Sequence, residues 1–178
     1  MRVQMAALIT ALVLMVAPYA RAQEMPKPSP EMAKLDFFEG NWTCQGKVND
    51  SPMGPGGAMT ATAQVRDDLG GFWQAGTIKG TIAKMPAFEG RFYETYDPAA
   101  KHFVMFWVDN MGGWSRSTSP GWQGDNMAYE GDSHMPGQKP MKTRDMFARS
   151  GATSMKHTWE IQVNGKWVPV GEENCTKK

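Results

Sequence analysis

The arrangement of apolar and polar residues changes at Asn41. From there onward, short runs rich in aromatic and β-branched residues alternate with clusters of Gly, Pro, Asn and Asp, and the apolar positions recur with a period of two. This pattern is typical of β-strands joined by tight turns, such as the one expected at Asn164-Gly165. We predict ten strands, at residues 41–48, 58–67, 72–80, 88–97, 101–109, 113–118, 125–131, 140–148, 152–162 and 166–176.

The first residues have a different character. Arg2 precedes an almost wholly apolar run from residue 5 to residue 17, and Ala20-Arg21-Ala22 follows the small-x-small rule for cleavage. Residues 1–22 therefore have the features of a secretory signal peptide, which predicts a periplasmic or secreted protein. The apolar run is too short to remain as a membrane-spanning helix, so we expect no transmembrane segment in the mature chain.

A short helix is expected between this segment and the first strand. Ser29 suits the N-cap and Pro30 suits the first helical position, while Gly40 would end the helix. The three prolines of residues 23–30 predict an extended tether. The predicted organisation is a signal peptide at 1–22, a tether at 23–30 and one folded domain at 31–178.

Composition narrows the class of protein. The 178 residues suffice for one ordinary domain, and 41% of them are hydrophobic, which argues against disorder. The chain has 19 basic and 18 acidic residues, so it lacks the basic surplus that nucleic-acid binding requires. Ten strands in one flat sheet would leave two exposed edges. We therefore predict an all-β, antiparallel up-and-down barrel, with a β-sandwich as the structural alternative.

Six short segments occur in order along the predicted domain: LDFFEGNW at 35–42, LGGF at 69–72, FEG at 88–90, TYDP at 95–98, FWVDN at 106–110 and WEI at 159–161. In these segments the sequence resembles a bacterial family known as domain of unknown function 1579. The G-x-W of Gly40 and Trp42 is also similar to the calycin superfamily of lipocalin-like and fatty-acid-binding-like barrels. That resemblance implies a structural role for both residues, with the tryptophan closing one end of the barrel. The family resemblance implies no established activity.

The two cysteines lie at opposite ends of the predicted domain. Cys44 belongs to the first strand and Cys175 to the last, and these strands are neighbours in a closed meander. Because an exported protein folds in an oxidising compartment, we expect a disulfide between them. Two separate thiols are the alternative.

The alternation within strands indicates which side chains share a face. Large apolar residues on one face of several strands predict an interior able to hold a small apolar or amphipathic molecule. Arg116 would contact an acidic head group of that molecule. The predicted ligand-binding residues are Phe92, Phe103, Met105, Trp107, Trp114, Arg116, Met155, His157 and Trp159.

His157 allows a second hypothesis, because it is expected to face this aromatic interior. It could be the axial ligand of a haem, or a core histidine hydrogen-bonded to a polar neighbour such as Arg116 or Glu94. We predict no cofactor and no metal site, since the sequence carries no recognisable metal-binding motif. It also lacks the common hydrolase and nucleotide-binding motifs, so we do not expect an enzyme. A protein-interaction or structural barrel with a filled interior is a further alternative.

Overall fold

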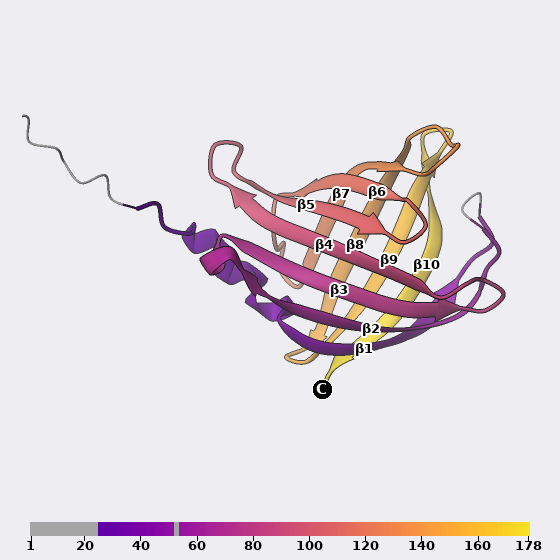
Figure 1. The fold of residues 1–178 in the computed structure, drawn as a ribbon, viewed down its shortest axis with the longest axis horizontal. Helices are drawn as coiled ribbons and strands as arrows, with labels where there is room; N and C mark the ends of the chain where they lie inside the picture. The colour runs from indigo at the N-terminus through magenta and orange to yellow at the C-terminus, as the bar shows by residue number, and fades with distance from the viewer. Residues whose placement is uncertain (1–24, 52–53) are drawn as a thin grey trace, which may run out of the picture.

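The computed structural model describes residues 25–51 and 54–178, so the expected signal peptide lies outside the described residues. All ten predicted strands are present in the described part (Figure 1). No helix of this part is long and apolar enough to cross a membrane. The strands are β1 (Gly40–Val48), β2 (Gly57–Asp68), β3 (Trp73–Ile82), β4 (Phe88–Asp97), β5 (His102–Asp109), β6 (Trp114–Ser119), β7 (Asn126–His134), β8 (Met141–Gly151), β9 (Ser154–Val163) and β10 (Lys166–Lys177).

The strands form a closed antiparallel barrel. Each strand pairs with its neighbours in sequence, and β1 pairs with β10 to complete the ring. This confirms the predicted barrel and excludes the sandwich. Because successive strands alternate in direction, the connections β1–β2, β3–β4, β5–β6 and β7–β8 lie at one end of the barrel. The start of β1 lies at the other end, where Figure 1 shows the N-terminal segment.

The N-terminal segment differs from the expected helix, because it is a 3₁₀ segment, η1 (Pro30–Phe38). Its apolar residues Met32, Leu35 and Phe38 are spaced by three, and all three are buried. A 3₁₀ helix has three residues per turn, so this geometry aligns the three side chains directly above one another. The predicted N-cap is present, since the Ser29 hydroxyl accepts a 3.3 Å hydrogen bond from the backbone N–H of Glu31.

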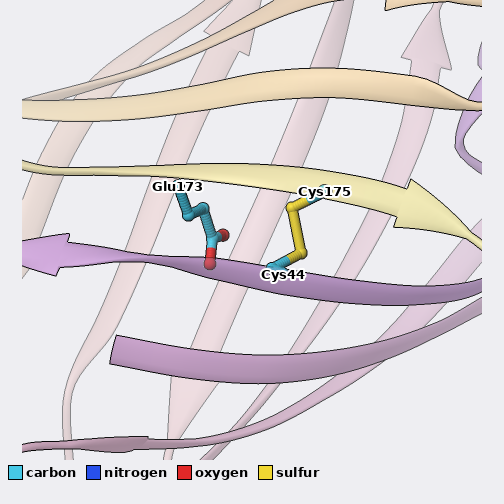
Figure 2. A group of neighbouring side chains, drawn as sticks. All are labelled: Cys44, Glu173 and Cys175. Atoms are coloured by element: carbon cyan, nitrogen blue, oxygen red, sulfur yellow. A yellow bond between two sulfur atoms is a disulfide. The ribbon is translucent and has the colours of Figure 1, made fainter. Parts of the chain in front are cut away.

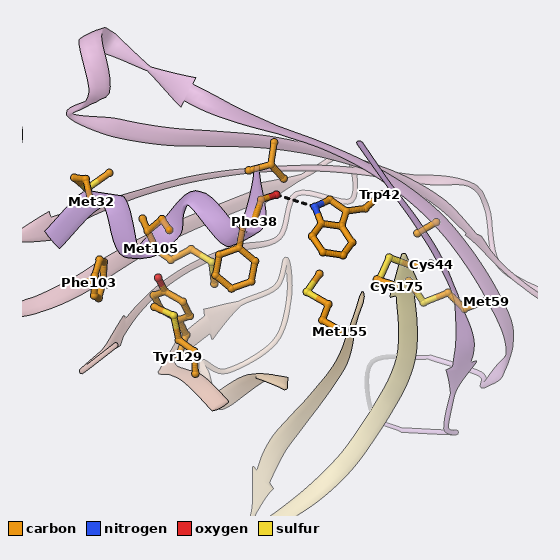
Figure 3. Close-up of a cluster of buried hydrophobic side chains, with 14 residues drawn as sticks. Met32, Phe38, Trp42, Cys44, Met59, Phe103, Met105, Tyr129, Met155 and Cys175 are labelled. Carbon is orange, nitrogen blue, oxygen red and sulfur yellow. Dashed lines mark hydrogen bonds between the residues drawn. A yellow bond between two sulfur atoms is a disulfide. The ribbon is translucent and has the colours of Figure 1, made fainter. Parts of the chain in front are cut away.

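Gly40 and Trp42 connect η1 to the first strand. Gly40 has a φ of +116°, a region that favours glycine, and it turns the chain from η1 into β1. Trp42 is only 1% exposed, and its Nε1 donates a 2.7 Å hydrogen bond to the carbonyl oxygen of Phe38 (Figure 3). Lys177 of β10 places its Nζ 5.2 Å from the centre of a Trp42 ring.

A layer of stacked side chains completes this end of the barrel. The guanidinium of Arg149 lies 3.5 Å from the ring centre of Trp122 and 4.5 Å from that of Phe37. The Trp122 indole N–H in turn donates a 2.8 Å hydrogen bond to the carbonyl oxygen of Lys34 in η1. We call this the closed end; it consists of Phe37, Phe38, Trp42, Trp122 and Arg149.

The expected disulfide between Cys44 and Cys175 is present, so the alternative of two separate thiols is wrong. The two residues are direct partners in the register of β1 and β10, with Cα atoms 4.0 Å apart. The bond therefore joins the two strands that close the barrel. Disulfides of this kind are typical of oxidising, extracytoplasmic compartments.

Candidate ligand-binding cavity

The barrel encloses a cavity of about 300 Å³. All ten strands contribute to its lining, which is mostly apolar. Three methionines from separate connections also line it: Met85 between β3 and β4, Met111 between β5 and β6, and Met135 between β7 and β8. These connections lie opposite the closed end, and Met111 is 43% exposed. We call these three methionines the mouth of the cavity.

Two tryptophans lie against the barrel wall and leave its centre unfilled. A Cβ atom built on Gly90 would lie 2.0 Å from Cη2 of Trp107, and one built on Gly171 would lie 2.3 Å from Cζ2 of Trp159. Gly171 is the cross-strand partner of Trp159, whereas Gly90 lies two residues before Phe92, the cross-strand partner of Trp107. The absence of a side chain at these two glycines gives each indole room to lie along the wall.

A histidine between two carboxylates forms the main polar group of the cavity. Nδ1 of His157 is 3.0 Å from Oε1 of Glu173, and its Nε2 is 3.2 Å from Oδ1 of Asp145. Burial alone would lower the pKa of His157, but the hydrogen bonds and charges of the two carboxylates outweigh it and raise the pKa to about 9. At neutral pH His157 is therefore an imidazolium that donates from both nitrogens.

The same imidazole ring is held by aromatic neighbours. It stacks on Phe147 with ring centres 4.5 Å apart and an interplanar angle of 6°, and it lies 5.1 Å from Trp159 at 34°. The wall formed by β8, β9 and β10 thus already holds one cation between aromatic rings and carboxylates.

A second buried carboxyl group lies nearer the closed end. Glu94 of β4 is 2% exposed, and its Oε2 accepts a 2.6 Å hydrogen bond from the hydroxyl of Tyr129 on β7. Burial raises the pKa of Glu94 to about 7, although the hydrogen bond from Tyr129 acts in the opposite direction. Burial and the nearby carboxyl group raise the pKa of Tyr129 as well.

Asp109 supports the cavity wall at the end of β5. Its Oδ2 accepts a 3.0 Å hydrogen bond from the indole N–H of Trp107, which orients that ring. Its Oδ1 accepts hydrogen bonds from the backbone N–H groups of Met111 (2.9 Å) and Gly113 (2.8 Å). One side chain therefore fixes both the turn beside the mouth and the orientation of one lining tryptophan.

Most of the predicted ligand-binding residues are brought together by the fold. Phe103 is 1% exposed and belongs to the core, but it does not line the cavity. Its ring packs against Tyr96 with centres 5.1 Å apart. The predicted residues that line the cavity are Phe92, Met105, Trp107, Met155, His157 and Trp159.

The prediction that Trp114 and Arg116 point into the barrel is wrong. Both lie on the outer face of β6, where Trp114 is 49% exposed and stacks on His134 with ring centres 3.7 Å apart. The inner positions of β6 belong to serines, of which Ser117 is 3% exposed. Alternation correctly predicted that Trp114 and Arg116 share a face of β6. The prediction that this face is the inner one, based on the large indole and the charge that could bind a head group, was wrong.

The polar partners of His157 were not predicted. Arg116 and Glu94 were the expected neighbours, whereas the structure places Asp145 and Glu173 there. The alternation of Arg144 and Asp145 along β8 is the available sequence signal, because one of the two must face inward. The choice between them depends on the strand register, which pairs Asp145 with Trp159.

The contacts of His157 do not fit the haem hypothesis. An axial ligand needs a nitrogen lone pair directed at the iron. Both ring nitrogens of His157 instead contact carboxylates, and its raised pKa keeps both of them protonated at neutral pH.

One group of side chains has the spacing of a metal site but not its chemistry. Ligand atoms of Cys44, Glu173 and Cys175 lie within 4.8 Å of one another (Figure 2). The two sulfurs are bonded to each other, so neither is the thiolate that a metal requires. Only the Glu173 carboxylate remains as a ligand in this group.

Comparisons with known proteins place the chain among its relatives. The barrel is similar to the crystal structure of Rv2717c from M. tuberculosis, with a TM-score of 0.64, 10% sequence identity, and coverage of 85% of this chain and 99% of that chain. At this identity the likeness concerns the fold alone. The comparison with curated proteins found no match. A family model described as "Protein of unknown function (DUF1579)" matches residues 27–177, and the chain therefore belongs to the DUF1579 family.

Proposed function

We propose that this protein binds a small apolar or amphipathic molecule inside its barrel and performs no covalent chemistry on it. The observation that carries this proposal is the cavity of about 300 Å³ with its mostly apolar lining. Small-molecule sites are typically apolar hollows of this size or larger, with a few convergent polar groups that fix orientation. Asp145, His157 and Glu173 are such a group, and they are paired with one another.

The proposal includes a calycin-like fold and an exported location. Trp42 at the closed end, with Lys177 from the last strand beside its ring, supports the calycin-like assignment. The Cys44–Cys175 disulfide supports a periplasmic or secreted location, as do the features of residues 1–22. In that compartment the protein would carry, sequester or sense its ligand.

The test uses N-phenyl-1-naphthylamine, a neutral apolar dye that becomes fluorescent in apolar surroundings. We expect the wild-type protein to bind it saturably, and we expect Trp159→Ala to weaken binding because the indole forms part of the cavity wall. Trp114→Ala is the matched control, since it removes an indole from the outer face of β6. The proposal is overturned if the wild type does not bind the dye, or if the two variants weaken binding equally.

A second candidate function has its own observation. Adjacent strands β4, β5 and β6 carry exposed apolar side chains on their outer faces, and the register pairs Tyr93 with Phe106 and Val108 with Trp114. All four are at least 39% exposed. Contiguous apolar surface of this kind favours protein interaction. If the barrel does not take up the dye, this outer face becomes the stronger basis for a function.

A further inference from the structure

The ionisable side chains around the cavity are almost all acidic. Among the described residues that line it there are five carboxyl groups and one histidine, and neither lysine nor arginine occurs. The single arginine expected to meet a ligand, Arg116, lies outside the barrel. The carboxyl groups belong to Glu94, Asp109, Asp145, Glu160 and Glu173.

The positive charges near these groups do not balance them. Glu160 pairs with Arg144, and the single charge of His157 is shared between Asp145 and Glu173. Asp109 accepts hydrogen bonds only from neutral N–H groups among the described residues. The interior therefore carries more negative than positive charge, in surroundings where charges are weakly screened.

Glu173 shows this deficit at a single atom. Glu173 is 7% exposed, and its Oε1 contacts His157. Its other carboxylate oxygen, Oε2, is buried and has no hydrogen-bond partner among the described residues. A buried carboxylate oxygen without a partner is unfavourable, because it has lost water and gained no donor. A cation entering the cavity would offset that loss.

The apolar lining suits the same kind of ligand. The faces of indole and phenyl rings attract cations, and Trp107, Trp159 and Phe92 all line the cavity. His157 already demonstrates the arrangement, since its imidazolium lies against Phe147 and Trp159 while it contacts two carboxylates.

We infer that the ligand is a cationic amphiphile, an amine or quaternary ammonium group joined to a short apolar body. This inference rests on the proposed function, because it names the class of molecule that occupies the same cavity. The head group would lie near the carboxylates of Asp145 and Glu173, and the apolar body would lie among the aromatic and methionine side chains. A fatty acid or other anionic amphiphile would meet repulsion there.

The test compares three molecules with the same tail and different head groups: octyltrimethylammonium, octanol and octyl sulfate. Binding to the full mature protein is measured by displacement of N-phenyl-1-naphthylamine at neutral pH. We expect the ammonium compound to bind at least tenfold more tightly than octanol, and octyl sulfate to bind more weakly than octanol.

Variants locate the source of the preference. We expect Glu173→Gln to reduce the preference for ammonium over octanol by about tenfold, because the preference is the ratio of the two affinities measured in the same variant. Glutamine keeps an oxygen that can accept from His157 and removes the charge. Glu172→Gln is the matched control, because Glu172 is the next residue on β10 and pairs with Lys47 and Lys156 on the outer face. Asp145→Asn provides a second variant if Glu173→Gln does not fold.

The outcomes separate this inference from the function on which it rests. If all three molecules bind equally, or octyl sulfate binds best, the cationic ligand is excluded while the binding function stands. If none displaces the dye because the dye itself does not bind, the proposed function fails and this inference fails with it. A preference for ammonium that Glu173→Gln and Asp145→Asn both leave intact would also overturn the assignment of the head-group site.

Discussion

The hydroxyl of Tyr129 donates a 2.6 Å hydrogen bond to Oε2 of Glu94, joining β7 to β4 inside the barrel. The two strands are not neighbours in the sheet, since β5 and β6 lie between them. The bond therefore crosses the interior rather than following the wall. It links two strands that are three positions apart around the barrel wall, near the closed end.

The raised pKa of Glu94 predicts a pH-dependent stability. Its pKa is about 7 in the folded protein against an ordinary value of 4.5, so the fold favours the protonated form. The stabilisation is complete below pH 4.5 and is lost as the pH rises through 7, a loss of about 3 kcal/mol for this group. We expect Glu94→Gln to remove that decline in urea-unfolding measurements across this range. Glu130→Gln, on the outer face of β7, should retain it; equal slopes in the two variants would contradict the prediction.

His157 predicts a second decline at higher pH. Its folded pKa of about 9 lies above the ordinary 6.5, so its contribution to stability is complete below pH 6.5 and is lost as the pH rises through 9. Asp145→Asn removes one of the two carboxylates that raise this pKa. We expect an NMR titration of the His157 ring to show a midpoint near 9 in the wild type and a lower midpoint in Asp145→Asn. Asp132→Asn, on the outer face, is the control, and a shift of the same size there would argue against the pairing.

Removing the disulfide is expected to lower the free energy of unfolding strongly while leaving the folded structure almost unchanged. Cys44 and Cys175 are 131 residues apart in sequence, and the chain-entropy model gives up to about 5 kcal/mol for a loop of that length. We expect the double variant Cys44→Ala, Cys175→Ala to keep its far-ultraviolet circular dichroism and to unfold at much lower urea concentration. Wild-type protein in reductant should behave similarly. An unchanged midpoint in both samples would show that the seam needs no covalent link.

The hydrogen bond from Trp42 to Phe38 predicts that a substitution at Trp42 lowers the free energy of unfolding. Trp42→Phe removes the N–H that donates to the carbonyl oxygen of Phe38, and leaves a buried acceptor without its partner. We expect the free energy of unfolding to fall by about 1–3 kcal/mol in denaturant titrations. Trp114→Phe, at an exposed position, should change it by less than about 0.5 kcal/mol. If both variants lost similar free energies of unfolding, the stabilising role of the Trp42 hydrogen bond would be contradicted.

The fold was largely predictable from the sequence, because period-two alternation and turn residues are local signals. The ten strands, their closure and the pairing of Cys44 with Cys175 all follow from the order of short strands along the chain. The N-terminal segment was less predictable, since Met32, Leu35 and Phe38 fit one face of either helix type. Their spacing of three residues distinguishes the two only when the packing is known.

The candidate site was predicted only in part, because the inward or outward direction of a strand face is not a local signal. Alternation groups residues by face but does not give the direction of a face, and β6 has few apolar residues to reveal it. Small serines fill its inner positions, so Trp114 and Arg116 point outward. The partners of His157 come from two other strands, and their approach depends on register across the sheet, which no short segment encodes.

The division of the barrel into a closed end and a mouth has an evolutionary consequence. The closed end holds the layer of stacked side chains and the β1–β10 seam holds the disulfide, whereas Met85, Met111 and Met135 lie in connections between strands. Mutations in these connections can accumulate with little penalty to folding. Under the proposed function, ligand recognition would diversify at the mouth, and the same connections would be the natural positions for redesigning this barrel toward new molecules.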